Sequence, residues 1–172
     1  MYNIMNVSKK EKYNKSIYNR NILSRKVYMN INEIGSNLHE NLEKKLVTML
    51  EDKCAVEGFI KGSSIKLITY SSGTVGHKNI EFTTSFECLI CKPVEGMIVS
   101  NCVVKNNTKA GIRAELKDET HSPLIIFVSR DHNYKSELFS KLNDNDIISV
   151  KIIGIRYELN DNSICAIAEL VD

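Results

Sequence analysis

The sequence has no tryptophan and only two prolines, so its core has to be built from Ile, Leu, Val, Phe and Tyr side chains. It also has no apolar run near the ~20 residues that a helix needs to cross a bilayer. The first residues are polar and lack the apolar stretch of a secretory signal peptide. We therefore expect a protein that is not secreted and has no membrane partner.

The sequence also lacks a regular disulfide pattern, because it has five cysteines, an odd number, at irregular spacing. This usage is typical of free, mostly buried thiols in a reducing compartment. The pair Cys88-x-x-Cys91 has no second pair to complete a zinc site, and alternation in a strand would point its two side chains to opposite faces. Cys91 could be combined with His132 and Asp131 as a nucleophile, but nothing in the local sequence supports a thiol enzyme. We expect no metal, no cofactor and no catalytic residue.

A strong basic charge is lacking as well, since the net charge is only +2. Residues 1–93 carry +5 and residues 94–172 carry −3, which excludes a strongly basic nucleic-acid binder in the C-terminal part. Four lysines lie close together near the N-terminus, and residues 1–20 are predicted to be a flexible basic extension. A basic arm that contacts nucleic acid is the alternative for this segment.

One amphipathic helix is predicted after the first strand. Residues 22–31 alternate in part, as in a strand, and Gly35 ends that pattern. Ser36 is a candidate N-cap, and an apolar stripe with spacings of three and four follows, ending near Asp52. The stripe consists of Leu38, Leu42, Leu46 and Met49 or Leu50.

Three further strands are predicted at residues 54–60, 64–70 and 79–91. The last of them alternates well, with one side formed by Ile80, Phe82, Thr84, Phe86, Cys88 and Ile90. Residues 71–79 form a Gly/Ser-rich loop, which is either a simple turn or a protruding contact loop. Residues 21–93 are therefore expected to form a small α+β domain with one helix on one face of the sheet.

Pro93 and Gly96 mark the predicted domain boundary, since proline disfavours a continuing central strand. Residues 94–172 then show three strands, a short helix and two more strands. The strands are predicted at 97–105, 110–116, 124–128, 147–157 and 163–171, with the helix at 132–142. This is the order of an OB-fold, an all-β five-stranded barrel that binds oligonucleotides over its second and third strands.

The barrel carries the candidate RNA-binding residues. Arg113 alternates with the apolar Ile112 and Ala114, so we expect it to face outward. It could neutralise phosphates or stack on bases together with its neighbours in the adjoining loops. The candidate set is Lys105, Lys109, Arg113, Arg130 and His132. The alternative is an ordinary solvated face, which the negative charge of this half favours.

Several segments resemble one known family. They are the helix start Ser36-Asn37-Leu38, residues 54–60, 86–96 (FECLICKPVEG), 109–112, 126–132 and 150–161. In this order they are similar to the stalk subunit called RNA polymerase subunit seven, which has eukaryotic, archaeal and large DNA virus versions. The resemblance runs from about Asn21 to the end and is nearest in character to the viral versions. Three features depart from the family pattern. They are the basic extension, the tip loop without proline, and Arg113 at a position where the family commonly has an aromatic residue.

The resemblance implies an N-terminal α+β tip domain and a C-terminal OB domain in a non-catalytic polymerase subunit. Its partners would be the polymerase core subunits near the clamp, a helical stalk partner and, weakly, single-stranded nascent RNA. The loop aligned with the family's core-binding tip is Ser72, Gly73, Thr74, Val75 and Gly76. A viral protein would act in the cytoplasmic viral factory or the virion, and a cellular one in the nucleus. The alternative is a free-standing OB-fold RNA-binding module of a translation or RNA-decay complex.

Overall fold

The computed structural model describes residues 17–76, 78–117, 121–133 and 139–171. Its internal contacts divide the chain into two compact units. We call Tyr18–Lys92 together with Tyr157–Ile164 the sheet unit, and Pro93–Arg156 together with Cys165–Asp172 the barrel unit. The domain limits predicted from the sequence, with a change at residue 93, stay a prediction.

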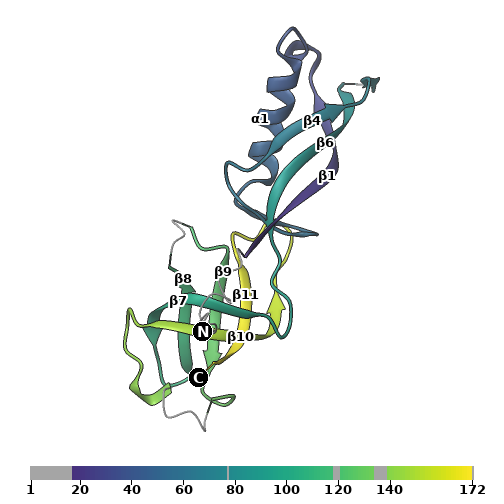
Figure 1. The fold of residues 1–172 in the computed structure, drawn as a ribbon. Helices are drawn as coiled ribbons and strands as arrows, with labels where there is room; N and C mark the ends of the chain where they lie inside the picture. The colour runs from purple at the N-terminus through teal and green to yellow at the C-terminus, as the bar shows by residue number, and fades with distance from the viewer. Residues whose placement is uncertain (1–16, 77, 118–120, 134–138, 172) are drawn as a thin grey trace, which may run out of the picture. The chain divides into compact units, whose positions relative to one another are not determined.

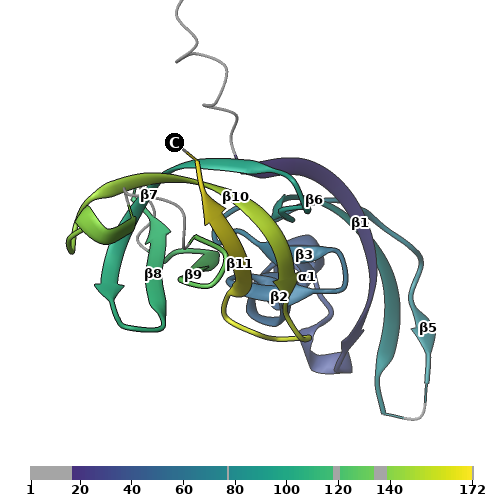
Figure 2. The ribbon, with the colours of Figure 1, turned by 90° about the horizontal axis from the view of Figure 1, so that it is seen from below.

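In the sheet unit the central strand is β6 (Ile80–Cys91), as Figures 1 and 2 show. Strand β1 (Tyr18–Met29) pairs with it antiparallel along its full length. Its other edge is shared by short strands that follow one another. These are β3 (Gly58–Ile60), β4 (Lys66–Tyr70) and β5 (Thr74–Val75), and β2 (Lys53–Ala55) pairs with β3.

The helix α1 (Leu38–Leu50) packs on one face of this sheet through the predicted stripe. Leu42 and Leu46 are fully buried, against the side of β6 that the sequence alternation had marked as apolar. Leu50, and not Met49, completes the stripe, because Met49 is 44% exposed. The N-cap is Asn37, one residue after the predicted Ser36. The structure confirms the α+β class of the N-terminal part.

Two strand boundaries differ from the sequence prediction. β1 begins at Tyr18, because its backbone pairing with β6 continues beyond the apolar alternation; residues 18–20, expected in the extension, are strand. Residues 54–60 are a hairpin and not one strand, since the chain turns between β2 and β3. Gly58 has φ +137°, and a Cβ there would lie 2.6 Å from the carbonyl oxygen of Cys91. Only glycine fits this close approach without strain.

A carboxylate at the end of α1 holds the loop before β4. Glu51 accepts hydrogen bonds from the consecutive backbone N–H groups of residues 63, 64 and 65, at 2.9, 3.0 and 3.0 Å. Glu43 of the same helix accepts another from the N–H of Leu67, at 2.9 Å. A negative charge at a helix C-terminus interacts unfavourably with the helix dipole. The hydrogen bonds that Glu51 accepts from the loop offset this cost and explain why an acid lies at this position.

Replacing Glu51 with alanine is expected to lower the free energy of unfolding by about 1.5 kcal/mol, because the N–H groups lose a charged acceptor. Urea denaturation measures the change. The matched control is Glu40→Ala, which removes an exposed acid from the first turn of the same helix. Its cost should be smaller, because the lost interaction with the helix dipole, ~0.3–1 kcal/mol, is partly offset by the higher helix propensity of alanine. Equal stability of both variants would show that the loop needs no tether.

The segment Tyr157–Ile164 belongs to the sheet unit by its contacts. The backbone N–H of Cys54 donates to the carbonyl oxygen of Asp161 at 2.8 Å, and the N–H of Asn160 donates back to the carbonyl oxygen of Cys54 at 2.8 Å. The Tyr157 hydroxyl donates to the carbonyl oxygen of Val56 at 3.2 Å. These bonds extend the pairing at the outer edge of β2.

The barrel unit is a closed five-stranded barrel with the strand order β10-β11-β9-β8-β7. Its strands are β7 (Ile98–Asn107), β8 (Gly111–Leu116), β9 (Leu124–Ser129), β10 (Ile147–Arg156) and β11 (Ile164–Leu170). Three consecutive strands lie side by side, the fifth lies next to the third, and the fourth closes onto the first. This arrangement confirms the predicted OB-type barrel.

Alternating apolar side chains fill the barrel, and a buried amide closes one end. Asn133 is 6% exposed; its Nδ2 donates to the carbonyl oxygen of Ser129 at 2.8 Å, and its Oδ1 accepts from the N–H of Leu170 at 2.9 Å. It thereby joins the ends of β9 and β11. Of the helix predicted at 132–142, the described part contains the 3-10 turn η3 (Phe139–Lys141), and residues 134–138 lie outside the described residues.

Candidate functional site

Arg113 lies at the centre of a row of side chains across the outer face of three barrel strands. In the strand register it stands opposite Asn106 of β7 and opposite Phe127 of β9. Its neighbours Ile112 and Ala114 are fully buried, and its own side chain is 54% exposed, as the alternation predicted. Asn106, Arg113 and Phe127 therefore form a polar, cationic and aromatic row on the outer surface, which we call the outer row.

Phe127 is the residue that the sequence reasoning missed. It is 39% exposed, and its ring lies on Gly111, where a Cβ would come within 2.8 Å of the ring and 2.5 Å of the carbonyl oxygen of Val128. The lack of a side chain at Gly111 therefore makes room for the Phe127 ring against β8, while part of the ring stays exposed. The run 124–128 reads as apolar throughout, but alternation with the buried Ile126 and Val128 could have placed Phe127 outside.

The charge of the outer row is reduced by an acid. Arg113 Nη2 lies 3.0 Å from Oε1 of Glu115, the next outward residue on β8. Exposed pairs of this kind contribute only ~0–1 kcal/mol, so a phosphate can compete with the carboxylate for the guanidinium. Lys105 lies nearby in the irregular stretch of β7 between Val104 and Asn106, and is exposed.

Arg130 holds the loop between β7 and β8. Its Nε donates to the carbonyl oxygen of Lys109 at 2.9 Å, and its backbone N–H donates to the carbonyl oxygen of Ala110 at 3.2 Å. Its guanidinium carbon lies 4.9 Å from the centroid of the Phe139 ring. Lys109 is exposed on the same loop, so the structure brings these two predicted residues together.

His132 lies in a different hollow of the barrel unit. It lines a cavity of about 690 Å³ together with Glu95, Lys151 and Glu169. Lys151 Nζ forms an ion pair with Glu169 Oε1 at 3.0 Å, so this hollow is a mixture of both charges. His132 therefore has different neighbours from the outer row, because no residue of that row lines this hollow.

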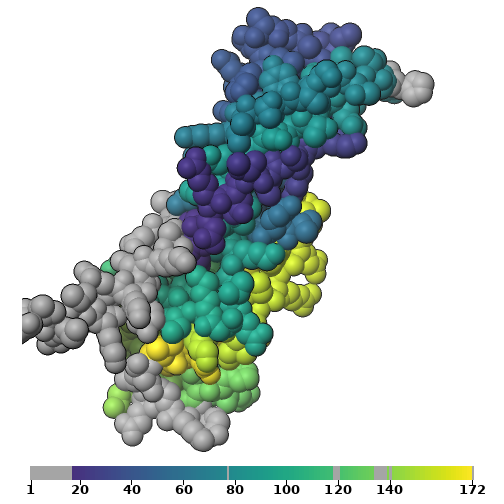
Figure 3. Space-filling model, turned by 45° about the vertical axis from the view of Figure 1, so that its right-hand side comes forward, coloured from purple at the N-terminus to yellow at the C-terminus, as the bar shows by residue number. Residues whose placement is uncertain are grey.

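The loop aligned with the family tip belongs to the teal part of the sheet unit, which forms part of the surface in Figure 3. Residues 72–76 are all exposed, and Val75 is 79% exposed. The loop is nevertheless ordered by the sheet, because β5 pairs with the start of β6 and the N–H of Gly76 donates to the carbonyl oxygen of Asn79 at 2.8 Å. It presents an apolar side chain on a short, supported hairpin.

Four of the five thiols are buried, and that of Cys165 is exposed. Burial raises the pKa of Cys88 to about 11 and that of Cys102 to about 12, so both are neutral near pH 7. Cys91, the nucleophile considered from the sequence, is fully buried. Within the described residues no group of three His, Cys, Asp or Glu side chains could hold a metal ion. In the same part of the chain, no helix is long and apolar enough to span a membrane.

The protein thus combines a small α+β part, a helix on an antiparallel sheet, with a closed OB-type barrel that has an aromatic residue on its outer face. The chain is 28% identical over 174 residues to a protein of Acanthamoeba polyphaga mimivirus, across 91% of this chain and 83% of the viral one. That relative is named "Putative DNA-directed RNA polymerase subunit L376". No family model matches the chain.

Proposed function

We propose that the protein is a non-catalytic subunit of a multisubunit DNA-directed RNA polymerase. The observation that carries this proposal is similarity to a viral protein named as such a subunit, along nearly the whole chain. The barrel adds a fold suited to single-stranded nucleic acid. Catalysis would reside in other subunits, and transcription in a viral factory or virion, or in a nucleus, is the setting that fits this role.

Within the polymerase, we assign the protein to the stalk, where it assists initiation and handles the transcript. Residues 72–76 and the sheet unit would dock on the core near the clamp, and a helical partner subunit would bind alongside. The exposed Val75 on its paired hairpin supports this role, since an apolar side chain on a rigid support loses little entropy on binding.

The docking role predicts that Val75→Asp lowers the amount of polymerase core recovered with the tagged protein by about tenfold, as expected when a central apolar contact is lost. Quantitative mass spectrometry of the purified complex measures the ratio. Val94→Asp, at another exposed valine, is the matched control and should leave the ratio unchanged. Equal recovery for V75D and wild type would remove the loop from the interface.

The outer row supports weak contact with nascent RNA. A base can stack on the partly exposed ring of Phe127, while Arg113 and Lys105 approach the phosphates on either side. Arg130 and Lys109 extend the basic surface along the adjoining loop, and His132 contributes least because it lies in the mixed-charge hollow. Weak contacts are sufficient when the transcript is already held by the polymerase, because the effective RNA concentration is then high.

Phe127→Ala is expected to weaken binding of a labelled single-stranded RNA by about tenfold, since stacking of one base on an aromatic ring contributes ~1–3 kcal/mol. Fluorescence anisotropy at low salt measures the affinity. Ile167→Ala, which removes another exposed apolar side chain from the barrel, is the control and should have little effect. If Phe127→Ala and Ile167→Ala weaken RNA binding equally, or if neither weakens it, the outer row is not a stacking site.

A further inference from the structure

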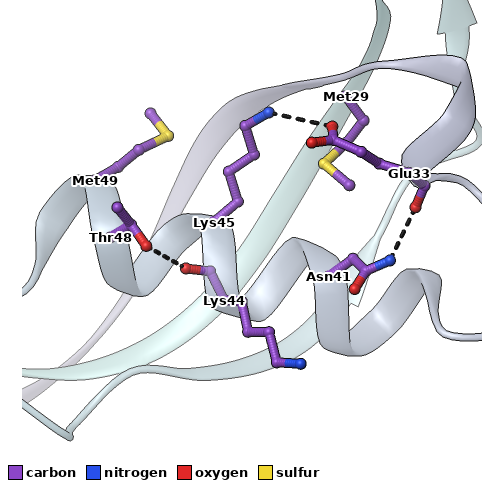
Figure 4. Close-up of a pocket in the computed structure, with 7 residues that line it drawn as sticks. All are labelled: Met29, Glu33, Asn41, Lys44, Lys45, Thr48 and Met49. Carbon is purple, nitrogen blue, oxygen red and sulfur yellow. Dashed lines mark hydrogen bonds and ion pairs between the residues drawn. The ribbon is translucent and has the colours of Figure 1, made fainter.

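A hollow of about 420 Å³ in the sheet unit lies between α1 and the turn that follows β1. Figure 4 shows the seven residues that line it. Met29 forms the floor and is 1% exposed, whereas Met49 on the helix is 44% exposed. The flexible, polarisable methionine side chains can adapt to different apolar partners. The rim is formed by Glu33, Asn41, Lys44, Lys45 and Thr48.

The rim of this hollow carries excess positive charge. Lys45 Nζ reaches Glu33 Oε2 at 3.5 Å, a long contact between two partly exposed groups, while Lys44 extends away from this pair in Figure 4. Among the described residues no carboxylate lies within ion-pair distance of Lys44. Lys53 lies outside this hollow, just after the end of the helix, where it donates to the carbonyl oxygen of Thr48 at 3.3 Å. Two ammonium groups and one carboxylate thus line this hollow.

Met49 also lines a second hollow of the sheet unit, of about 370 Å³. This hollow includes Lys53 and the strongly exposed apolar residues Val56 and Leu159, which are 75% and 66% exposed. Arg25 and Glu57 also line it and neutralise each other as an ion pair, so Lys53 supplies its excess charge. Met49 lines both hollows, and each has apolar side chains together with lysine, an arrangement that suits a peptide segment lying across both. We call the two hollows together the methionine groove.

We propose that the methionine groove binds an acidic segment of a partner protein that carries apolar side chains between its carboxylates. The apolar side chains contact Met49 above the buried Met29, and the carboxylates pair with Lys44, Lys45 and Lys53. A nucleic acid also has negative charge, but no aromatic ring for base stacking is among the described residues that line either hollow, and methionine and valine favour aliphatic contacts. This surface is independent of the RNA contact proposed above.

The test uses the full-length protein with ¹³C-methyl methionine and three labelled peptides, one of Glu and Leu, one of Glu and Ser, and one of Lys and Leu. The Glu/Leu peptide should shift the methyl signals of Met29 and Met49 and leave that of Met97 in the barrel unit unchanged. Lys44→Glu with Lys45→Glu should weaken its binding by about tenfold or more, whereas arginine at both positions should preserve it. Circular dichroism verifies that both variants are folded.

Each other outcome overturns the proposal. Equal binding of the Glu/Ser peptide would show attraction by charge alone, and equal binding of the Lys/Leu peptide would show unselective apolar contact. A single-stranded RNA that shifts the same two methyl signals would make the groove a nucleic-acid surface. No shift with any peptide would leave the groove without a peptide-binding role. None of these results depends on whether the chain is a polymerase subunit.

Discussion

Replacing Leu46 with alanine is expected to lower the free energy of unfolding of the sheet unit by about 2–5 kcal/mol. Leu46 is fully buried beneath α1, and with Leu42 it joins the helix to the apolar side of β6. The smaller side chain loses this burial and leaves a cavity that the strand pairing around β6 prevents from closing. Hydrogen exchange of peptides from α1 and β6, followed by mass spectrometry, measures the loss.

The same measurement tests the proposed division into two folding domains. If the two units fold separately, β8 and β9 of the barrel should keep their protection in the Leu46→Ala protein. Met49→Ala, three residues further along the same helix, changes an exposed side chain and should cost about 0.5 kcal/mol or less. Equal loss of protection in β8 would mean that the chain unfolds as one cooperative body.

Replacing Gly111 with alanine is expected to destabilise the barrel by about 2–3 kcal/mol. The new methyl group would lie 2.5 Å from the carbonyl oxygen of Val128, a backbone atom of the paired strand, and 2.8 Å from the Phe127 ring. The strands β8 and β9 must then separate, or the ring must leave its position. Either response should also weaken RNA binding at the outer row, because the stacking surface is displaced.

Gly154→Ala is the matched control for this substitution. Gly154 lies on β10 of the same barrel, and a Cβ there meets no atom within 4 Å. Thermal unfolding should therefore show a clear decrease for Gly111→Ala and almost none for Gly154→Ala. Similar melting temperatures for the two variants would mean that β8 and β9 tolerate a side chain between them, and that the ring is not held by this contact.

The sequence was sufficient to predict the elements whose packing follows a simple period. The spacing of Leu38, Leu42 and Leu46 predicted α1, and strict alternation predicted the buried side of β6. The five barrel strands were located within a few residues; β7 and β8 show alternation between a filled interior and solvent, and β9 is a short apolar run. Burial of apolar side chains makes the largest contribution to the stability of these elements, and the spacing of those side chains in the sequence reveals it.

Features that depend on distant backbone contacts could not be predicted. The hairpin in residues 54–60 follows from the approach of Gly58 to Cys91, which no local pattern reveals. The tether at Glu51 requires knowledge of where residues 63–65 pass. Of the candidate RNA-binding residues, the outward direction of Arg113 was predictable, whereas the separate place of His132 depends on the path after β9. Their role in RNA binding stays a prediction.

The central claim is that this protein is a subunit of a DNA-directed RNA polymerase. Affinity purification of the tagged protein from its native source, with quantitative mass spectrometry of the proteins that accompany it, tests this claim most directly. We expect the large polymerase subunits in amounts close to that of the tagged protein, at a salt concentration that removes free RNA. Recovery of ribosomal proteins or RNA-decay factors, without polymerase subunits, would contradict it.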